Sequence, residues 1–169
     1  MRPLEDLRTA NAARAAAQAS IEHADTKASL LLAGLGGPAA LVADRPGLLA
    51  TAERAGALAT AGAIVLALVI AVGALVAGWH LGRCLAPRLA VPGDQSGNRF
   101  ALPVLAARRG LPGSIPIEEL RDQAWSAAGL LAGIAMRKYR NIQASLPWVA
   151  ASTAGSLAWL CADLILQAH

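Results

Sequence analysis

Apolar residues are grouped into three stretches, and the longest lies between Gly56 and Gly82 without an acid, lysine or arginine. An α-helix rises about 1.5 Å per residue and the hydrocarbon core of a bilayer is about 30 Å thick, so about 20 apolar residues suffice to cross it. We therefore predict a membrane-spanning helix over residues 55–82. A second apolar stretch predicts a span over residues 146–166, with Asp163 near its outer end in reach of water.

The third apolar stretch, residues 28–43, is short for a span and contains three glycines and Pro38. We predict that it nevertheless crosses the membrane. It then forms a transmembrane hairpin with residues 55–82, because residues 44–47 between them have the composition of a turn.

Two segments have the pattern of amphipathic helices. Residues 1–27 carry an apolar stripe at spacings of three and four, and no helix-breaking residue separates them from residues 28–43. The stripe comprises Ala10, Ala13, Ala17, Ile21, Ala24, Ala28 and Leu31, whereas Arg14, Gln18, Glu22 and Asp25 lie on the other face. Residues 83–143 combine an irregular polar connection with a helix that starts at residues 114–116 and whose apolar second half is too short to span.

Composition and charge indicate an all-α integral membrane protein. Hydrophobic residues make up 56% of the 169 residues, charged residues 15% and aromatic residues 4%, which disfavours a β-barrel. Four lysines and arginines precede the first predicted span, two lie in the hairpin link and nine lie between Arg83 and Arg140. The positive-inside rule then places the N-terminus and residues 83–143 in the cytoplasm. We predict one domain over residues 1–169, a helical bundle with three transmembrane helices and cytoplasmic amphipathic helices.

Two polar clusters at the predicted cytoplasmic ends of the spans are candidate binding sites. The first consists of Asp25, Thr26 and Lys27. It is also explained as a charged collar, in which the lysine reaches the headgroups and the acid pairs with a nearby cation. The second consists of Arg137, Lys138, Tyr139 and Arg140. Three cations around one aromatic ring suit a phosphate and a stacked base, but they also suit contact with anionic lipid.

Arg99, which precedes an aromatic residue in the polar connection, and Trp125 are weaker candidates. The first is also explained as a loop residue and the second as an interfacial anchor. The sequence has no phosphate-binding glycine loop, nucleophile elbow or zinc-ligand spacing, so we predict no enzymatic activity, metal or cofactor. The net charge of +4 is explained by membrane topology, and we expect no direct nucleic-acid binding.

The stretch Ala24-Asp25-Thr26-Lys27-Ala28-Ser29-Leu30-Leu31-Leu32-Ala33, followed by a second span, a polar linker and Arg137-Lys138-Tyr139-Arg140 before a last span, resembles the Pycsar effector family of small bacterial membrane proteins. The resemblance covers nearly the whole chain. It implies a multi-pass protein of the bacterial inner membrane that senses a cyclic pyrimidine mononucleotide, cyclic UMP or cyclic CMP, made by a partner cyclase during phage infection. The effector then damages that membrane.

These expectations combine into one hypothesis for the site. The two clusters lie side by side on the cytoplasmic face, where Lys27, Lys138 or Arg140 neutralises the phosphate. Tyr139 or Trp125 offers a stacking surface, and Asp25 accepts a hydrogen bond from the base or ribose. Three helices enclose little of a pore, so permeabilisation by a homo-oligomer is expected.

A second hypothesis concerns the biological setting. Similar actinobacterial proteins have been labelled integral membrane proteins of plasmid transfer or spread. Such a protein would act through protein partners and recognise no nucleotide. A neighbouring gene for a DNA translocase would favour this alternative, whereas a neighbouring cyclase gene would favour the effector.

Overall fold

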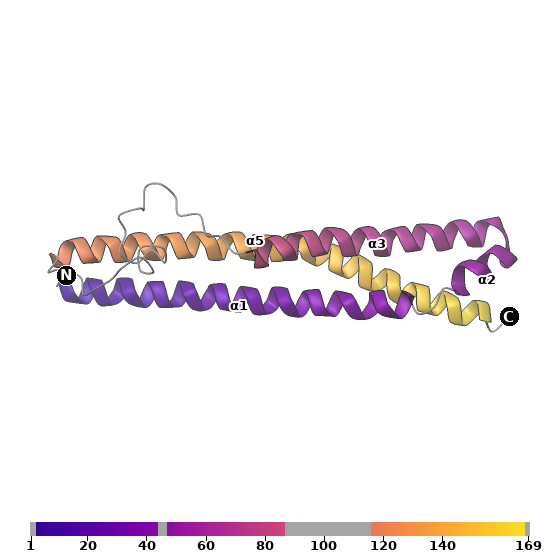
Figure 1. The fold of residues 1–169 in the computed structure, drawn as a ribbon, viewed down its shortest axis with the longest axis horizontal. Coiled ribbons are helices and arrows are strands. Elements are labelled where there is room, and N and C mark those ends of the chain that lie inside the picture. Colours follow the sequence, from indigo (N-terminus) through magenta and orange to yellow (C-terminus); the bar gives the residue numbers. More distant parts are fainter. Residues whose placement is uncertain (1–2, 44–46, 87–115, 168–169) are drawn as a thin grey trace, which may run out of the picture. The chain divides into compact units, whose positions relative to one another are not determined.

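The computed structural model describes residues 3–43, 47–86 and 116–167, and nearly all of them are helical (Figure 1). The helices are α1 (Pro3–Ala43), α2 (Gly47–Ala55), α3 (Ala57–Leu85) and α5 (Ile117–Gln167). The all-α prediction is confirmed for the described residues. The chain divides into two compact units, one formed by Met1–Asp25 with Ala86–Tyr139 and the other by Thr26–Leu85 with Arg140–His169.

Helix α1 is continuous from Pro3 to Ala43, as the absence of a breaker between residues 1–27 and 28–43 predicts. Its predicted apolar stripe is confirmed at Ala10, Ala24 and Ala28, which are fully buried. Because alanine side chains are small, they let a neighbouring helix backbone come close.

In the first unit, the N-terminal segments of α1 and α5 run side by side in the same direction (Figure 1). Two contacts define how the two helices are aligned along their length. Asp6 on α1 contacts Arg121 on α5, and Asp25 contacts Lys138 further along both helices. The buried residues of α5 here are Ala124, Ala127, Ala128 and Ala135, separated by three, one and seven positions. At about 3.6 residues per turn these positions lie on one side of the helix, as expected for the side that packs against a neighbouring helix.

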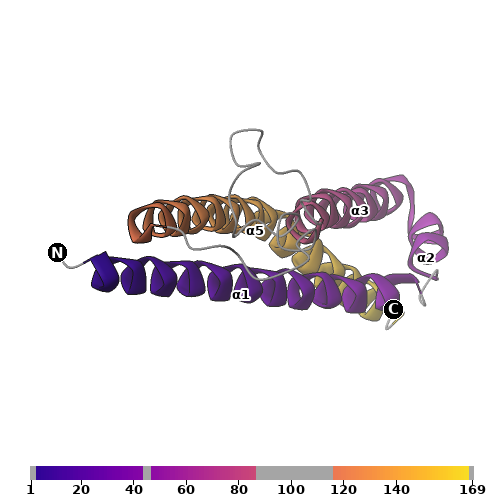
Figure 2. The ribbon, with the colours of Figure 1, turned by 60° about the vertical axis from the view of Figure 1, so that its left-hand side comes forward.

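A short helix occupies most of the link between the first two apolar stretches. We expected a turn and a brief polar stretch, whereas residues 47–55 form α2, which packs against α3 (Figure 2). Gly56 ends α2 with a positive φ of 115°, and its backbone N–H donates to the carbonyl of Ala52 over 3.1 Å. This is a helix C-cap in the left-handed conformation, which glycine adopts without steric cost. Helix α3 therefore starts at Ala57, two residues after the predicted start at 55, and continues to Leu85, three residues beyond the predicted end at 82.

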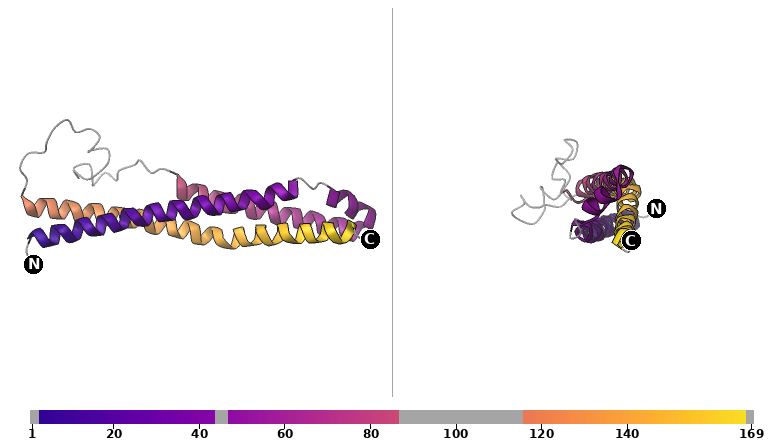
Figure 3. Two further views of the ribbon diagram at one scale, coloured as in Figure 1. Left: turned by 90° about the horizontal axis from the view of Figure 1, so that it is seen from below. Right: turned by 90° about the vertical axis from the view of Figure 1, so that its right-hand side faces the viewer.

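In the second unit, α3 packs closely against the C-terminal part of α5 (Figure 3). The hydroxyl of Ser152 donates to the backbone carbonyl of Ile70 over 3.2 Å. A Cβ atom added to Gly73 would come within 3.0 Å of the Trp148 carbonyl oxygen and 3.1 Å of Ser152. The nearby apolar core contains Ala52, Ala63, Ile70 and Trp159. Small residues thus set the short distance between these helices.

Helix α5 is a single helix where the sequence suggested a cytoplasmic helix within residues 83–143 and a separate span over residues 146–166. It begins at Ile117, as the start signal at residues 114–116 predicts, and it passes through Pro147 to Gln167. A proline in a helix interior removes one backbone hydrogen bond, but the helix continues on both sides of Pro147. At about 1.5 Å per residue, this helix is about 75 Å long, so only part of it can lie in the hydrocarbon core.

Helices α3 and α5 are both long and apolar enough to cross a membrane, and in their most apolar windows only 22% and 28% of the residues are buried. The core helix of a soluble protein would be mostly buried. Leucines such as Leu58, Leu75 and Leu157 are exposed instead, as expected for side chains that face lipid. Among the described helices, α1 is not one of those that are long and apolar enough to cross a membrane. Three transmembrane helices are therefore not confirmed, and the span over residues 28–43 stays a prediction.

Candidate functional site

Asp25 and Lys138, one from each predicted cluster, are in contact in the first unit. The ammonium Nζ of Lys138 donates to Oδ1 of Asp25 in a hydrogen-bonded ion pair. The lysine side chain is only 14% exposed and the aspartate 38% exposed, so the pair is partly shielded from water. Helix α1 supplies the acid and α5 the cation, and the parallel course of the two helices brings them to the same level. The prediction that these segments lie together is confirmed for this pair.

The other predicted site residues follow or flank this pair along the two helices. Arg137 is exposed and Tyr139 is half-buried, and both belong to the first unit. Thr26, Lys27 and Arg140 are exposed and belong to the second unit. Arg99 lies outside the described residues. The positions of these residues do not show whether they bind a ligand, so the binding roles assigned to them from the sequence stay predictions.

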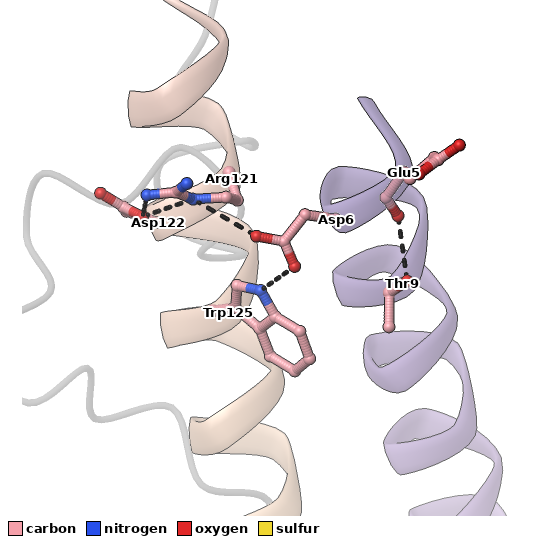
Figure 4. Close-up of polar contacts among 6 residues, drawn as sticks. All are labelled: Glu5, Asp6, Thr9, Arg121, Asp122 and Trp125. Atoms are coloured by element: carbon pink, nitrogen blue, oxygen red, sulfur yellow. Dashed lines mark hydrogen bonds and ion pairs between the residues drawn. The ribbon is translucent and has the colours of Figure 1, made fainter. Parts of the chain in front are cut away.

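Trp125 belongs to a different cluster, near the start of α5 (Figure 4). Its indole Nε1 donates to Oδ1 of Asp6 over 3.4 Å, and Nε of Arg121 lies 3.7 Å from Oδ2 of the same carboxylate. Because Trp125 precedes Lys138 by 13 positions in one continuous helix, the two are separated by about 20 Å along its axis. Trp125 therefore lies far from the Asp25–Lys138 pair.

Arg121 also binds its neighbour Asp122, with Nε and Nη2 at 2.9 and 2.8 Å from the same carboxylate oxygen. The hydrogen bond and charge of Asp122 raise the pKa of the Arg121 guanidinium, so this group stays charged. Sequence reasoning missed Asp6 and Arg121. Their pairing depends on the register between α1 and α5, which no local pattern in either helix reveals.

The first unit brings carboxylates of α1 next to cations of α5. Two of the contacts join a carboxylate of α1 to a cation of α5, and the exposed Arg137 directly precedes Lys138. Guanidinium and ammonium groups form charge-assisted hydrogen bonds with phosphate oxygens. Among the described residues, no group of three histidines, cysteines or acids is placed to hold a metal ion.

The second unit contains a further set of polar residues that the sequence-based hypothesis did not use. Four of them are buried along one side of α5, namely Ser145, Ser152, Ser156 and Asp163, and we call this set the polar stripe. We expected Asp163 to reach water near the outer end of the span, and this is wrong, because the residue is only 1% exposed. The indole Nε1 of Trp159 is buried beside the stripe and has no hydrogen-bond partner in the described part of the chain.

Comparison with known proteins identifies one family. The model of the Pycsar effector protein domain matches residues 9–166, which include Asp25, Lys138 and both helices that are able to span a membrane. No curated protein and no solved structure matches the chain. The family match agrees with the resemblance found at the two polar clusters.

Proposed function

The chain belongs to the Pycsar effector family, and on this basis we propose that it senses a cyclic pyrimidine mononucleotide and then impairs the integrity of the bacterial inner membrane. Membership makes it an effector of antiphage defence, in a family of transmembrane effectors that is not known for catalysis. The proposed ligand is cyclic UMP or cyclic CMP, supplied by a partner cyclase. The proposed active form is a homo-oligomer, because one copy has too few helices to enclose a pore.

The contact between Asp25 and Lys138 carries this proposal. In the structure, the carboxylate of Asp25 on α1 neutralises the ammonium of Lys138 on α5. A cyclic nucleotide phosphate carries one negative charge, so it competes with Asp25 for the same cation. A ligand shifts a conformational equilibrium only as far as its affinities for the two states differ. Replacing an internal carboxylate with a ligand phosphate supplies such a difference, because it removes one link between α1 and α5.

The connectivity of the helices supports three spans, with the N-terminus and Lys138 on the cytoplasmic side. If α3 crosses the bilayer once, α2 and Leu85 lie on opposite sides. Positive residues place Lys138 on the side of Leu85. Asp6 and Asp25 contact α5 in the first unit, so they lie on that side too. On this proposed topology, α1 crosses between Asp25 and α2, which is where residues 28–43 lie.

Calorimetry of the full-length protein in detergent against cyclic UMP and cyclic CMP tests the sensing step, with cyclic AMP as a base control. We expect binding of a pyrimidine nucleotide by the wild-type protein, and weaker binding by at least about tenfold in Lys138→Ala, because a charge-assisted phosphate contact is lost. Arg8→Ala is the matched control, since it removes an exposed cation of α1 that lies outside the candidate site.

Leakage of dye-loaded liposomes tests the second step. We expect cyclic UMP or cyclic CMP to increase leakage through the wild-type protein and not through Lys138→Ala. If no cyclic pyrimidine nucleotide binds and leakage is unchanged, the effector mechanism is wrong for this chain. A protein of plasmid transfer that acts through protein partners would then be the better hypothesis.

A further inference from the structure

The C-terminal part of α5 buries its polar residues and exposes its apolar ones. The members of the polar stripe are between 0% and 4% exposed, although serine and aspartate are rarely buried in water-soluble proteins. On the rest of the surface, Leu157, Leu164 and Ile165 are about 60% exposed. This arrangement is the reverse of that in a soluble helix, and it is expected where lipid surrounds the bundle and polar groups avoid it.

The polar stripe follows one face of α5 over a length close to the thickness of the bilayer core. Its members are separated by seven, four and seven positions, so at 3.6 residues per turn they lie within roughly 20° of one line along the helix. Ser145 and Asp163 are about 27 Å apart along the axis, against about 30 Å for the hydrocarbon core. One face of α5 therefore offers polar groups over almost the whole depth of the membrane.

Helix packing alone explains the serines but not the whole stripe. The hydroxyls of Ser145, Ser152 and Ser156 each donate to a backbone carbonyl, at 2.7, 3.2 and 2.9 Å, as serines in tightly packed transmembrane helices do. An ionisable residue is different, because its burial in a membrane is costly and commonly marks an ion pathway. The buried indole Nε1 of Trp159, four residues before Asp163, also lacks a hydrogen-bond partner in the described chain.

We propose that the polar stripe lines a water-filled, cation-selective conduit in the active assembly, with Asp163 as the residue that selects for cations. The inference rests on the proposed function, because it assumes that the assembled protein permeabilises the membrane. A ring of carboxylates from several copies attracts cations and repels anions. The conduit is closed at Ser152 in the single chain, because Gly73 of α3 packs directly on this residue. Opening requires α3 to move away from this face of α5.

Ion selectivity in planar bilayers tests the role of Asp163. Full-length protein is activated with cyclic UMP or cyclic CMP under a KCl gradient, and the reversal potential gives the ratio of potassium to chloride permeability. We expect a cation-selective current that loses selectivity by roughly fivefold in Asp163→Asn, the effect of one charge at contact distance in water. Glu53→Gln is the matched control, because it removes an exposed acid of α2 and should leave the ratio unchanged.

Cysteine accessibility provides a second test that does not depend on the charge of Asp163. In a background with Cys84→Ala and Cys161→Ala, we expect Ser145→Cys, Ser152→Cys and Ser156→Cys to react with a charged methanethiosulfonate reagent only after activation. Ala150→Cys and Ala154→Cys, on the exposed face of the same helix, should not react in either state.

The outcomes separate this inference from the proposed function. A nucleotide-dependent current whose selectivity is unchanged in Asp163→Asn, with unreactive stripe cysteines, overturns the conduit and leaves the effector mechanism standing. Absence of any nucleotide-dependent current or leakage in the wild-type protein overturns both. A selective current together with reactive stripe cysteines supports both.

Discussion

The ion pair between Lys138 and Asp25 joins two residues separated by 113 positions in the chain. Exposed ion pairs contribute about 0–1 kcal/mol to stability, because water screens the charges and ordering the side chains costs entropy. Lys138 is only 14% exposed, so its pair should lie at or above the top of that range. The contact therefore favours the arrangement of α1 and α5 within the first unit by a modest free energy.

A double-mutant cycle measures this contribution. We expect Asp25→Asn and Lys138→Met each to destabilise the detergent-solubilised protein, with a coupling free energy of about 1 kcal/mol between them. The same cycle at Asp6 and Arg121 is the comparison. That pair is separated by 3.7 Å, and Arg121 also binds Asp122, so its coupling should be smaller. Thermal unfolding of the single and double variants gives both values, and a larger coupling for Asp6 and Arg121 would contradict this ranking.

Charge reversal at the same pair separates its structural role from its role in sensing. The double variant Asp25→Lys with Lys138→Asp keeps opposite charges in contact, so we expect it to retain most of the wild-type stability. It places the cation on α1, and cyclic nucleotide binding should be lost or at least about tenfold weaker. Thermal unfolding and calorimetry of this one variant provide both measurements. Wild-type nucleotide affinity in the reversed pair would exclude Lys138 as the phosphate-binding group.

At the scale of the helices, the close approach of α3 and α5 depends on Gly73. We predict that Gly73→Ala destabilises the protein by about 1–3 kcal/mol, because the added methyl group would meet backbone atoms that cannot move aside without shifting a helix. Gly78→Ala is the matched control on the same helix, since a Cβ atom there meets nothing within 4 Å and alanine favours a helix. Thermal unfolding in detergent should separate the two variants. Equal stability would show that the two helices are less tightly packed than described.

The boundary between α2 and α3 depends on the conformation of Gly56. Alanine at a φ of 115° is strained, so we predict that Gly56→Ala lowers the unfolding free energy by about 1–2 kcal/mol. Gly62→Ala replaces an exposed glycine inside α3 with open space around it, and it should be neutral or stabilising. A stable Gly56→Ala variant would indicate that α2 and α3 join in a different conformation.

The helices could be predicted from the sequence to different extents. Hydropathy located α3 and the helical character of residues 146–166, because long apolar runs depend on local composition alone. Helix α2 was missed, since nine residues with mixed polarity give a weak periodic signal and depend on packing against α3. The continuity of α5 was also missed, because two separate helices were expected where one passes through Pro147, and a proline permits either a kinked helix or a new start.

The candidate site was predicted more completely in its composition than in its geometry. Asp25 and Lys138 were placed together because both lie at predicted cytoplasmic ends of spans, and the contact bears this out. Trp125 was grouped with them because aromatic residues stack on bases, but a continuous α5 separates it from Lys138 by about 20 Å. The distance between Trp125 and Lys138 could be estimated only once both residues were known to lie in one continuous helix.

At the scale of the whole molecule, both proposed activities use α5. This one helix carries Lys138, where a ligand phosphate would compete with Asp25, and the polar stripe, which would line the conduit. A ligand that changes how α5 is held at its N-terminal part thus acts on the element that supplies the conduit lining. Both activities require Lys138 in the cytoplasm and α2 outside, so the number of times α1 crosses the bilayer decides whether the scheme is possible.

Labelling of intact cells with a membrane-impermeant thiol reagent determines that number. The cysteines are introduced at exposed positions, Arg8→Cys in α1, Glu53→Cys in α2 and Arg137→Cys in α5, with both native cysteines replaced by alanine. If residues 28–43 cross the bilayer, Glu53→Cys is labelled from outside, whereas the other two react only after permeabilisation. If they do not cross, Arg8→Cys reacts on the same side as Glu53→Cys. That result would conflict with the contacts of Asp6 and Asp25 to α5, which require α1 and Lys138 to share one side of the membrane.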